Sequence, residues 1–238
     1  MERIDNMQMN PSQTKGSKFK KNSFEMEAWS LNKLVCGIDE VGRGCLAGPL
    51  VTAAVILPLN KTNRLLKDSK LTTPEERLKA YTWITKHCWY GVGIVHNRII
   101  DQHNIYRATL IAMKRALVNL LATTDQYPEA ILVDAMPLEL SDTSYKGIPV
   151  HHFPKGERKS SSIAAASIVA KVTRDAMMTR FDPLFPGFHL ASHKGYSTEK
   201  HKGALLIQKP TIIHRKSFLN NINAAIIKGD HDGQQSLC

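Results

Sequence analysis

Apolar runs of strand length alternate with amphipathic stretches along most of the chain. Residues 33–39 (KLVCGID) and 48–57 (GPLVTAAVIL) are two such runs, and the glycine-rich segment between them is typical of a turn. Two strands so close in sequence predict an antiparallel pair. Strand character returns in residues 89–100, 130–137 and 147–156. These runs supply the strands of the sheet that we expect.

Three stretches carry helix signals instead. Residues 72–87 begin with a cap, Thr72 or Thr73, followed by a proline and two glutamates that suit the first turn of a helix. Residues 104–123 repeat apolar side chains at helical spacing. Residues 160–181 are rich in small side chains, which predicts a helix able to approach its neighbour closely.

The end of the folded region is predicted to be helical. Residues 192–208 indicate a loop leading into a helix, and a last helical stretch follows Ser217. The order of elements predicts an α/β fold with a mixed sheet flanked by helices and a helical C-terminal segment. We expect one catalytic domain over residues 31–228, a flexible basic tail over residues 1–30 and a disordered tail over residues 229–238.

Charge narrows the class of partner. The chain has 32 Lys and Arg against 21 Asp and Glu, a formal net charge of +11, which suits a polyanion such as a nucleic acid. Its four cysteines form no C-x-x-C pair. No apolar run approaches the ~20 residues of a membrane span, and the N-terminus lacks the apolar segment of a signal peptide. We expect a cytoplasmic protein that does not bind membranes and acts as a monomer.

Acidic residues follow two of the predicted strands. Asp39 and Glu40 end the first strand, and Asp134 ends the run AILV. If these strands lie side by side, three carboxylates converge, and divalent cations would relieve their repulsion. Such oxygen ligands suit Mg²⁺ or Mn²⁺, and a pair of these ions is a known device for displacement at phosphorus. Taken alone, an Asp at a strand end is more often a turn former.

A second feature follows the first acids within two residues. Gly42 and Gly44 allow a backbone to approach a ligand closely, and Arg43 offers a planar group for phosphate or hydroxyl oxygens. A tight turn with an exposed arginine explains the same tripeptide. Beside Asp39 and Glu40, we interpret it as a clamp on a sugar-phosphate backbone.

Five ordered blocks carry a resemblance to a known family. GIDEVGRGCLAGPLVTAAVIL, KDSKLT, ILVDA, KGERKSSSIAAASIVAKVTRD and HKGYST, in this order and spacing, resemble bacterial ribonuclease HII. The resemblance covers about residues 33–218. It implies an RNase H-like fold and hydrolysis of RNA in RNA–DNA hybrids, including cleavage 5′ of a single ribonucleotide in duplex DNA, which serves ribonucleotide removal during DNA replication and repair.

The resemblance also implies roles for individual residues. The expected products are 5′-phosphomonoesters, and the expected cofactors are two ions of Mg²⁺ or Mn²⁺. The matching positions are Asp39, Glu40 and Asp134 among the metal-binding acids, Gly42, Arg43 and Gly44 for reading the ribose 2′-hydroxyl, Tyr196 for packing on the sugar, and Lys70 near the nucleic-acid backbone.

The fourth acid departs from the family pattern. Where the family has KGD, this chain has KGE, so Glu157 takes the place of an aspartate. Glutamate keeps the charge but adds one methylene, which can move the carboxylate by about an ångström. Asp175 is the alternative fourth acid, although we expect it to form a structural salt bridge. The rival function is therefore a protein of this fold that binds RNA–DNA hybrids and cuts them weakly.

Overall fold

A five-stranded mixed sheet organises the computed structural model, which describes residues 21–67 and 72–219. The strand order is β3-β2-β1-β4-β5. The strands β1 to β3 pair antiparallel, whereas β4 runs parallel to both β1 and β5. The predicted antiparallel pair and mixed sheet are thus confirmed. The strand bounds are β1 Val35–Val41, β2 Leu50–Ile56, β3 Trp89–Val95, β4 Ala130–Asp134 and β5 Val150–Phe153.

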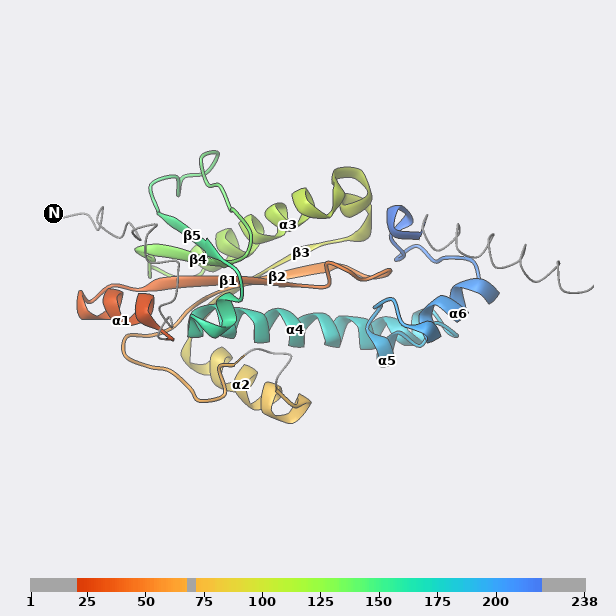
Figure 1. The fold of residues 1–238 in the computed structure, drawn as a ribbon, viewed down its shortest axis with the longest axis horizontal. Helices are drawn as coiled ribbons and strands as arrows, with labels where there is room; N and C mark the ends of the chain where they lie inside the picture. The colour runs from red at the N-terminus through yellow and green to blue at the C-terminus, as the bar shows by residue number, and fades with distance from the viewer. Residues whose placement is uncertain (1–20, 68–71, 220–238) are drawn as a thin grey trace, which may run out of the picture.

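Helices cover both faces of the sheet (Figure 1). The helix α3 (Asn97–Leu121) packs on one face, and α4 (Ser161–Phe181) and α2 (Pro74–His87) pack on the other. Side chains alternate between the faces of a strand. Because Ile38 belongs to the core beneath α3, its neighbour Asp39 points toward α4. This alternation decides on which side of the sheet the acids gather.

The close approach of α4 to β1 depends on small residues. A Cβ atom on Gly37 would lie 2.1 Å from the backbone carbon of Ser162, so only glycine fits at this position of the strand. The alanines that follow in α4 are fully buried against the sheet. The predicted small-residue helix therefore lies against the middle of the sheet, where its next turns reach the end of β1.

The N-terminal boundary is earlier than we predicted. Helix α1 (Ser23–Ser30) occupies part of the expected tail, and its Glu25 is 0 % exposed. Glu25 Oε1 accepts hydrogen bonds from Ser160 Oγ and the Ser162 backbone N–H, at the start of α4. A buried carboxylate at a helix N-terminus compensates the unpaired N–H groups there. Residues 1–20 and 220–238 lie outside the described part of the chain, and with them the predicted domain end at residue 228 and most of the helical stretch predicted after Ser217.

The third predicted strand was too long. Strand β3 ends at Val95, and α3 begins at Asn97, so residues 97–100 are helical. Asn104 interrupts this helix with φ 65°, and its side chain accepts a hydrogen bond from the Arg107 backbone N–H. The helical pattern that begins at residue 104 therefore marks a real start within α3. About two turns of helix precede it and lack a clear hydrophobic period.

The other predicted elements agree more closely with the structure. Thr73 is the cap of α2 and forms a capping box with Glu76. The helical C-terminal segment is confirmed for its described part. It contains the 3₁₀ turn η4 (Asp182–Leu184) and two short helices, α5 (Leu190–His193) and α6 (Glu199–Ile207).

Three buried histidines hold this C-terminal segment together. The rings of His193 and His201 stack at 4.3 Å, and His201 Nε2 lies 3.1 Å from His214 Nε2. His201 Nδ1 lies 2.9 Å from the carbonyl oxygen of Tyr196, and His214 Nδ1 accepts a hydrogen bond from the Thr211 backbone N–H. These partners suit neutral rings, with His201 donating to Tyr196 and accepting from His214.

The histidine cluster makes stability depend on pH. Burial, together with the neighbouring His201 and His193, lowers the pKa of His214 from the ordinary 6.5 to about 4. A histidine with a lowered folded pKa stabilises the fold fully above pH 6.5, and this contribution is lost as the pH falls toward about 4.

We therefore expect a larger acid destabilisation in the native protein than in His214→Gln. Between pH 7.5 and pH 5 the native Tm should fall by on the order of 5 °C more than the Tm of the variant. Thermal unfolding of both proteins across this range is the measurement. Parallel Tm curves for the two proteins would contradict the assignment of a buried neutral His214.

Candidate active site at the ends of β1 and β4

Two acids lie next to each other at the ends of parallel strands. In the register of β1 and β4, Ile38 faces Val133, so Asp39 and Asp134 follow on adjacent strands and on the same face of the sheet. Glu40 is the next residue of β1. The prediction that these two strands lie side by side is confirmed, and the parallel register places Asp39 and Asp134 on neighbouring strands.

Asp39 is the most buried of these acids, at 7 % exposure. Burial raises its pKa well above the usual 3.8, and the charges of Glu40 and Asp134 raise it further. Two hydrogen bonds act in the opposite direction, one with Ser167 of α4 and one in which the Glu40 backbone N–H donates to Asp39 Oδ1 at 2.8 Å. Glu40 and Asp134 are thus close enough for their charges to act on the buried Asp39.

A short turn brings Glu157 to the same corner. The backbone N–H of Gly156 donates to Asp134 Oδ1 at 2.8 Å. Gly156 begins the 3₁₀ turn η3 (Gly156–Arg158), after Lys155 has adopted a left-handed conformation with φ 59°. The hydrogen bond therefore fixes the backbone beside Glu157 against the Asp134 side chain. Glu157 itself is partly buried.

The oxygen-rich corner fits a divalent cation in its chemistry. Among the described residues, no three His, Cys, Asp or Glu side chains lie close enough together to hold a metal ion. Glu40 pairs with Arg43 at 3.4 Å, and Asp134 accepts from Gly156. The repulsion that raises the pKa of Asp39 is what a cation would relieve. Carboxylate oxygens are the ligands that Mg²⁺ and Mn²⁺ prefer.

The glycine-rich segment wraps around a buried arginine. Gly42 has φ 89°, and a Cβ atom there would lie 2.2 Å from Nε of Arg174. Gly44 is exposed, and a Cβ atom there would have no neighbour within 4 Å. The two glycines therefore differ. Gly42 serves the packing of the turn, whereas Gly44 leaves space open at the surface for a ligand.

Two fully buried arginines connect this segment to the rest of the site. Arg174 donates to the carbonyl oxygens of Pro49, Lys194 and Ala47, and Arg215 donates to those of Gly42, Arg43 and Gly48. Within the described residues, neither guanidinium forms a salt bridge with a carboxylate. Backbone carbonyls satisfy both charges, which rigidly fixes the segment that carries Arg43.

Tyr196 lies beside this segment. It forms an isolated antiparallel bridge with Cys45, and its side chain is 36 % exposed. The ammonium of Lys171 and the guanidinium of Arg174 lie 5.5 and 5.6 Å from the centre of its ring. The tyrosine ring is thus held by cations from α4 and remains accessible to a ligand.

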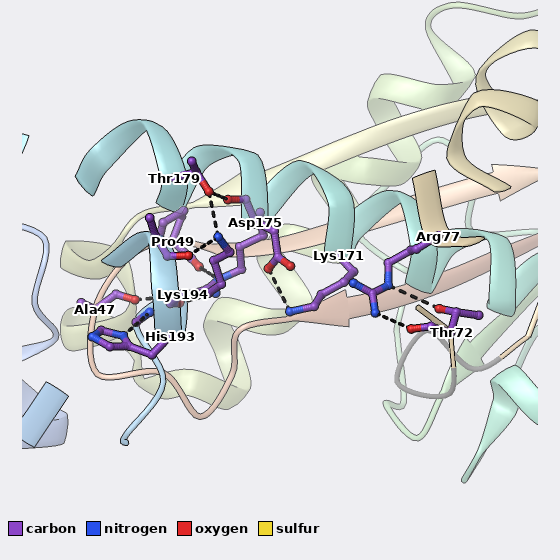
Figure 2. A network of polar contacts seen from close by, with 12 residues as sticks. Ala47, Pro49, Thr72, Arg77, Lys171, Asp175, Thr179, His193 and Lys194 are labelled. Carbon is purple, nitrogen blue, oxygen red and sulfur yellow. Dashed lines mark hydrogen bonds and ion pairs between the residues drawn. The ribbon is translucent and has the colours of Figure 1, made fainter. Parts of the chain in front are cut away.

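Asp175 has a different partner from the acids of the strand ends. Its Oδ1 accepts from Lys171 Nζ at 2.8 Å, one helical turn away on α4 (Figure 2). This confirms the expected salt bridge. Lys70, the remaining predicted site residue, lies outside the described residues.

Comparison with known proteins decides the family. The family model described as Ribonuclease HII matches residues 36–221. The protein named Ribonuclease HII in Lactobacillus delbrueckii subsp. bulgaricus is 45 % identical over 197 residues, which cover 82 % of this chain and 73 % of the relative. The chain belongs to the ribonuclease HII family. It is accordingly an endoribonuclease that hydrolyses the RNA of RNA–DNA hybrids and leaves 5′-phosphomonoesters.

Solved structures agree with this membership in the ribonuclease HII family. The ribonuclease H2 of Pyrococcus horikoshii has a TM-score of 0.64 and 26 % identity, covering 82 % of this chain and 99 % of that chain. Bst-RNase HIII, solved in complex with Mn²⁺, has a TM-score of 0.58 and 25 % identity over 74 % of this chain and 70 % of that one. The predicted RNase H-like fold is confirmed. None of the described helices has the length and apolarity to cross a bilayer.

Sequence reasoning missed three residues that shape the site, Ser167, Arg174 and Arg215. Ser167 lies among small residues, which indicate only that the helix packs closely. The two arginines do not stand out in a chain that is rich in basic residues. A signal existed for Ser167 and Arg174, since positions 167 and 174 are seven apart and lie on one helix face. Nothing in the sequence showed that this face points at β1.

The contrast between the two glycines gives a stability prediction. Gly42→Ala should destabilise the fold by about 3 kcal/mol, because it combines a left-handed backbone with a clash against Arg174. This corresponds to a fall in Tm of roughly 10 °C. Gly44→Ala is the matched control and should change stability by less than about 0.5 kcal/mol. Thermal unfolding that gave equal losses for both variants would contradict this packing.

Proposed function

We propose that the enzyme needs divalent metal ions and that it also cuts 5′ of a single ribonucleotide embedded in duplex DNA. The observation that carries this proposal is the burial of Asp39 beside Glu40 and Asp134. Three acids that repel one another, one of them buried, are costly for a protein that only binds an anionic backbone. They are useful when cations mediate the contact with a phosphate.

We propose Asp39, Glu40, Asp134 and Glu157 as the ligands of one or two ions of Mg²⁺ or Mn²⁺. Bound there, the ions would activate the attacking water and stabilise the charge that develops on the leaving oxygen. The protein's part is to hold the four acids in place. Ser167 orients Asp39, and the backbone N–H of Gly156 orients Asp134. The same turn carries Glu157.

The exposed side of the glycine-rich segment supports recognition of a ribonucleotide. Only the 2′-hydroxyl distinguishes an RNA sugar from a DNA sugar, so a selective enzyme has to contact it. Gly44 leaves open space, and Arg43 lies next to it with its side chain 39 % exposed. The accessible ring of Tyr196 offers a surface on which the sugar can pack. Because the buried arginines fix the backbone of this segment, its conformation needs to change little when it contacts the sugar.

We further propose that the enzyme acts as a monomer in the cytosol. Cys36, Cys45 and Cys88 are free thiols, and the first two are buried. Reduced cysteines fit a reducing compartment. The proposed partners are RNA–DNA hybrids and duplex DNA containing ribonucleotides.

Cleavage of matched duplexes tests the proposed function. One labelled DNA duplex carries a single ribonucleotide, a second is all DNA, and a third is an RNA–DNA hybrid. Each is incubated with Mg²⁺, Mn²⁺ or chelator. We expect cutting of the first and third only, with either metal, and on the 5′ side of the single ribonucleotide. Binding of the first duplex without cutting in either metal would contradict the proposal and favour a hybrid-binding protein.

Variants at position 157 test the fourth ligand. Glu157→Gln keeps the shape but removes the charge, so kcat should fall by about 10²-fold. Glu157→Asp restores the usual family residue and should keep activity within about tenfold of the native protein. The exposed Glu139→Gln is the matched control and should change nothing. A Glu157→Gln enzyme with native activity in both metals would remove Glu157 from the site.

A further inference from the structure

Lys171 lies between the two halves of the active site. Ser167, which bonds Asp39, is one helical turn before it on the same face of α4. On its other side, the ammonium of Lys171 is 5.5 Å from the centre of the Tyr196 ring. A strand that reaches from the acids to the tyrosine therefore passes the Lys171 ammonium.

The ammonium of Lys171 is oriented by one ion pair and keeps further hydrogen-bond donors for a ligand. The Lys171 side chain is 21 % exposed, and its Nζ donates to Asp175 Oδ1 at 2.8 Å (Figure 2). A lysine ammonium has three donors, so the bond to Asp175 leaves two for a ligand. The ion pair keeps the long side chain in one orientation, which lowers the entropy lost when an anion binds.

Helix stabilisation alone explains the pair poorly. Ion pairs four residues apart favour a helix best when the acid precedes the base, as the helix dipole requires. Here Lys171 precedes Asp175, which is the weaker order. Lys202 and Glu199 of α6 show the preferred order at a spacing of three residues. The position of Lys171 between Asp39 and Tyr196 gives it another use.

We propose that Lys171 binds a backbone phosphate of the cleaved strand, between the phosphate at the acids and the sugar on Tyr196. Asp175 is the positioning residue that aims the Lys171 ammonium. The contact is electrostatic and independent of base sequence, as contacts of lysine with phosphates are. This inference rests on the proposed function, because it takes the strand to run from the acids to Tyr196.

The salt dependence of binding tests this contact directly. A fluorescent DNA duplex with one ribonucleotide is titrated with protein in chelator, between 50 and 300 mM salt, and anisotropy gives the Kd. Each lysine contact with a phosphate adds about 0.9 to the slope of log Kd against log salt. Lys171→Met should lower the slope by about that amount and weaken binding about tenfold at the lowest salt. Lys171→Arg should restore both.

Two further variants separate a phosphate contact from a structural ion pair. Asp175→Asn removes the carboxylate that orients Lys171 but keeps the cation, so it should keep the native slope and weaken binding by less than Lys171→Met. Lys114→Met is the matched control. Lys114 also pairs with an aspartate, Asp142, and its side chain is 28 % exposed, but it lies on α3 across the sheet. It should leave the slope unchanged.

Four outcomes overturn the inference. A native slope in Lys171→Met overturns it, and so does Asp175→Asn that weakens binding as much as Lys171→Met. If Lys171→Met does not fold, Lys171→Arg and Asp175→Asn provide the test. Equal losses of binding affinity in these two variants overturn the inference. Cleavage by the native protein is measured in parallel with Mg²⁺. A native protein that neither binds nor cuts this duplex overturns the proposed function together with the inference.

Discussion

The repulsion among Asp39, Glu40 and Asp134 is the constraint on which the arrangement of the site depends. A carboxylate that is 7 % exposed beside two others costs folding free energy at neutral pH, because its pKa is raised. The surrounding structure limits this cost with donors placed one by one. Ser167, the Glu40 backbone N–H and the Gly156 backbone N–H each bond an acid. The fold thus stabilises acids that we propose as ligands of divalent cations.

The approach of α4 to the sheet makes those donors possible. Gly37 and the alanines of α4 remove the side-chain volume between the helix and β1, so the same face of α4 reaches both Asp39 and Tyr196. Arg174, further along that face, then joins the turn after β1 to the segment before Tyr196 through carbonyl oxygens. One helix therefore sets the relative positions of the acids, the glycine-rich segment and Tyr196.

The sequence was informative where local chemistry determines the structure. The acids at the strand ends, the capped helix α2 and the small-residue helix α4 were all predicted, because each depends on neighbours within a few positions. Helix α1 was missed because Glu25 and Ser160, its decisive contact, are 135 residues apart. The roles of Arg174 and Arg215 were missed for the same reason. A basic residue shows in the sequence, whereas its burial among carbonyl oxygens is decided by the tertiary structure.

The central question is whether the proximity of these acids is costly without cations and relieved by them. The most direct measurement is the Tm of the native protein and of Asp39→Asn, each in chelator and in Mn²⁺. We predict that Asp39→Asn melts higher than the native protein in chelator, since it removes a buried like charge. Mn²⁺ should raise the native Tm much more than that of the variant. A lower Tm for the variant in chelator, together with no native response to Mn²⁺, would contradict it.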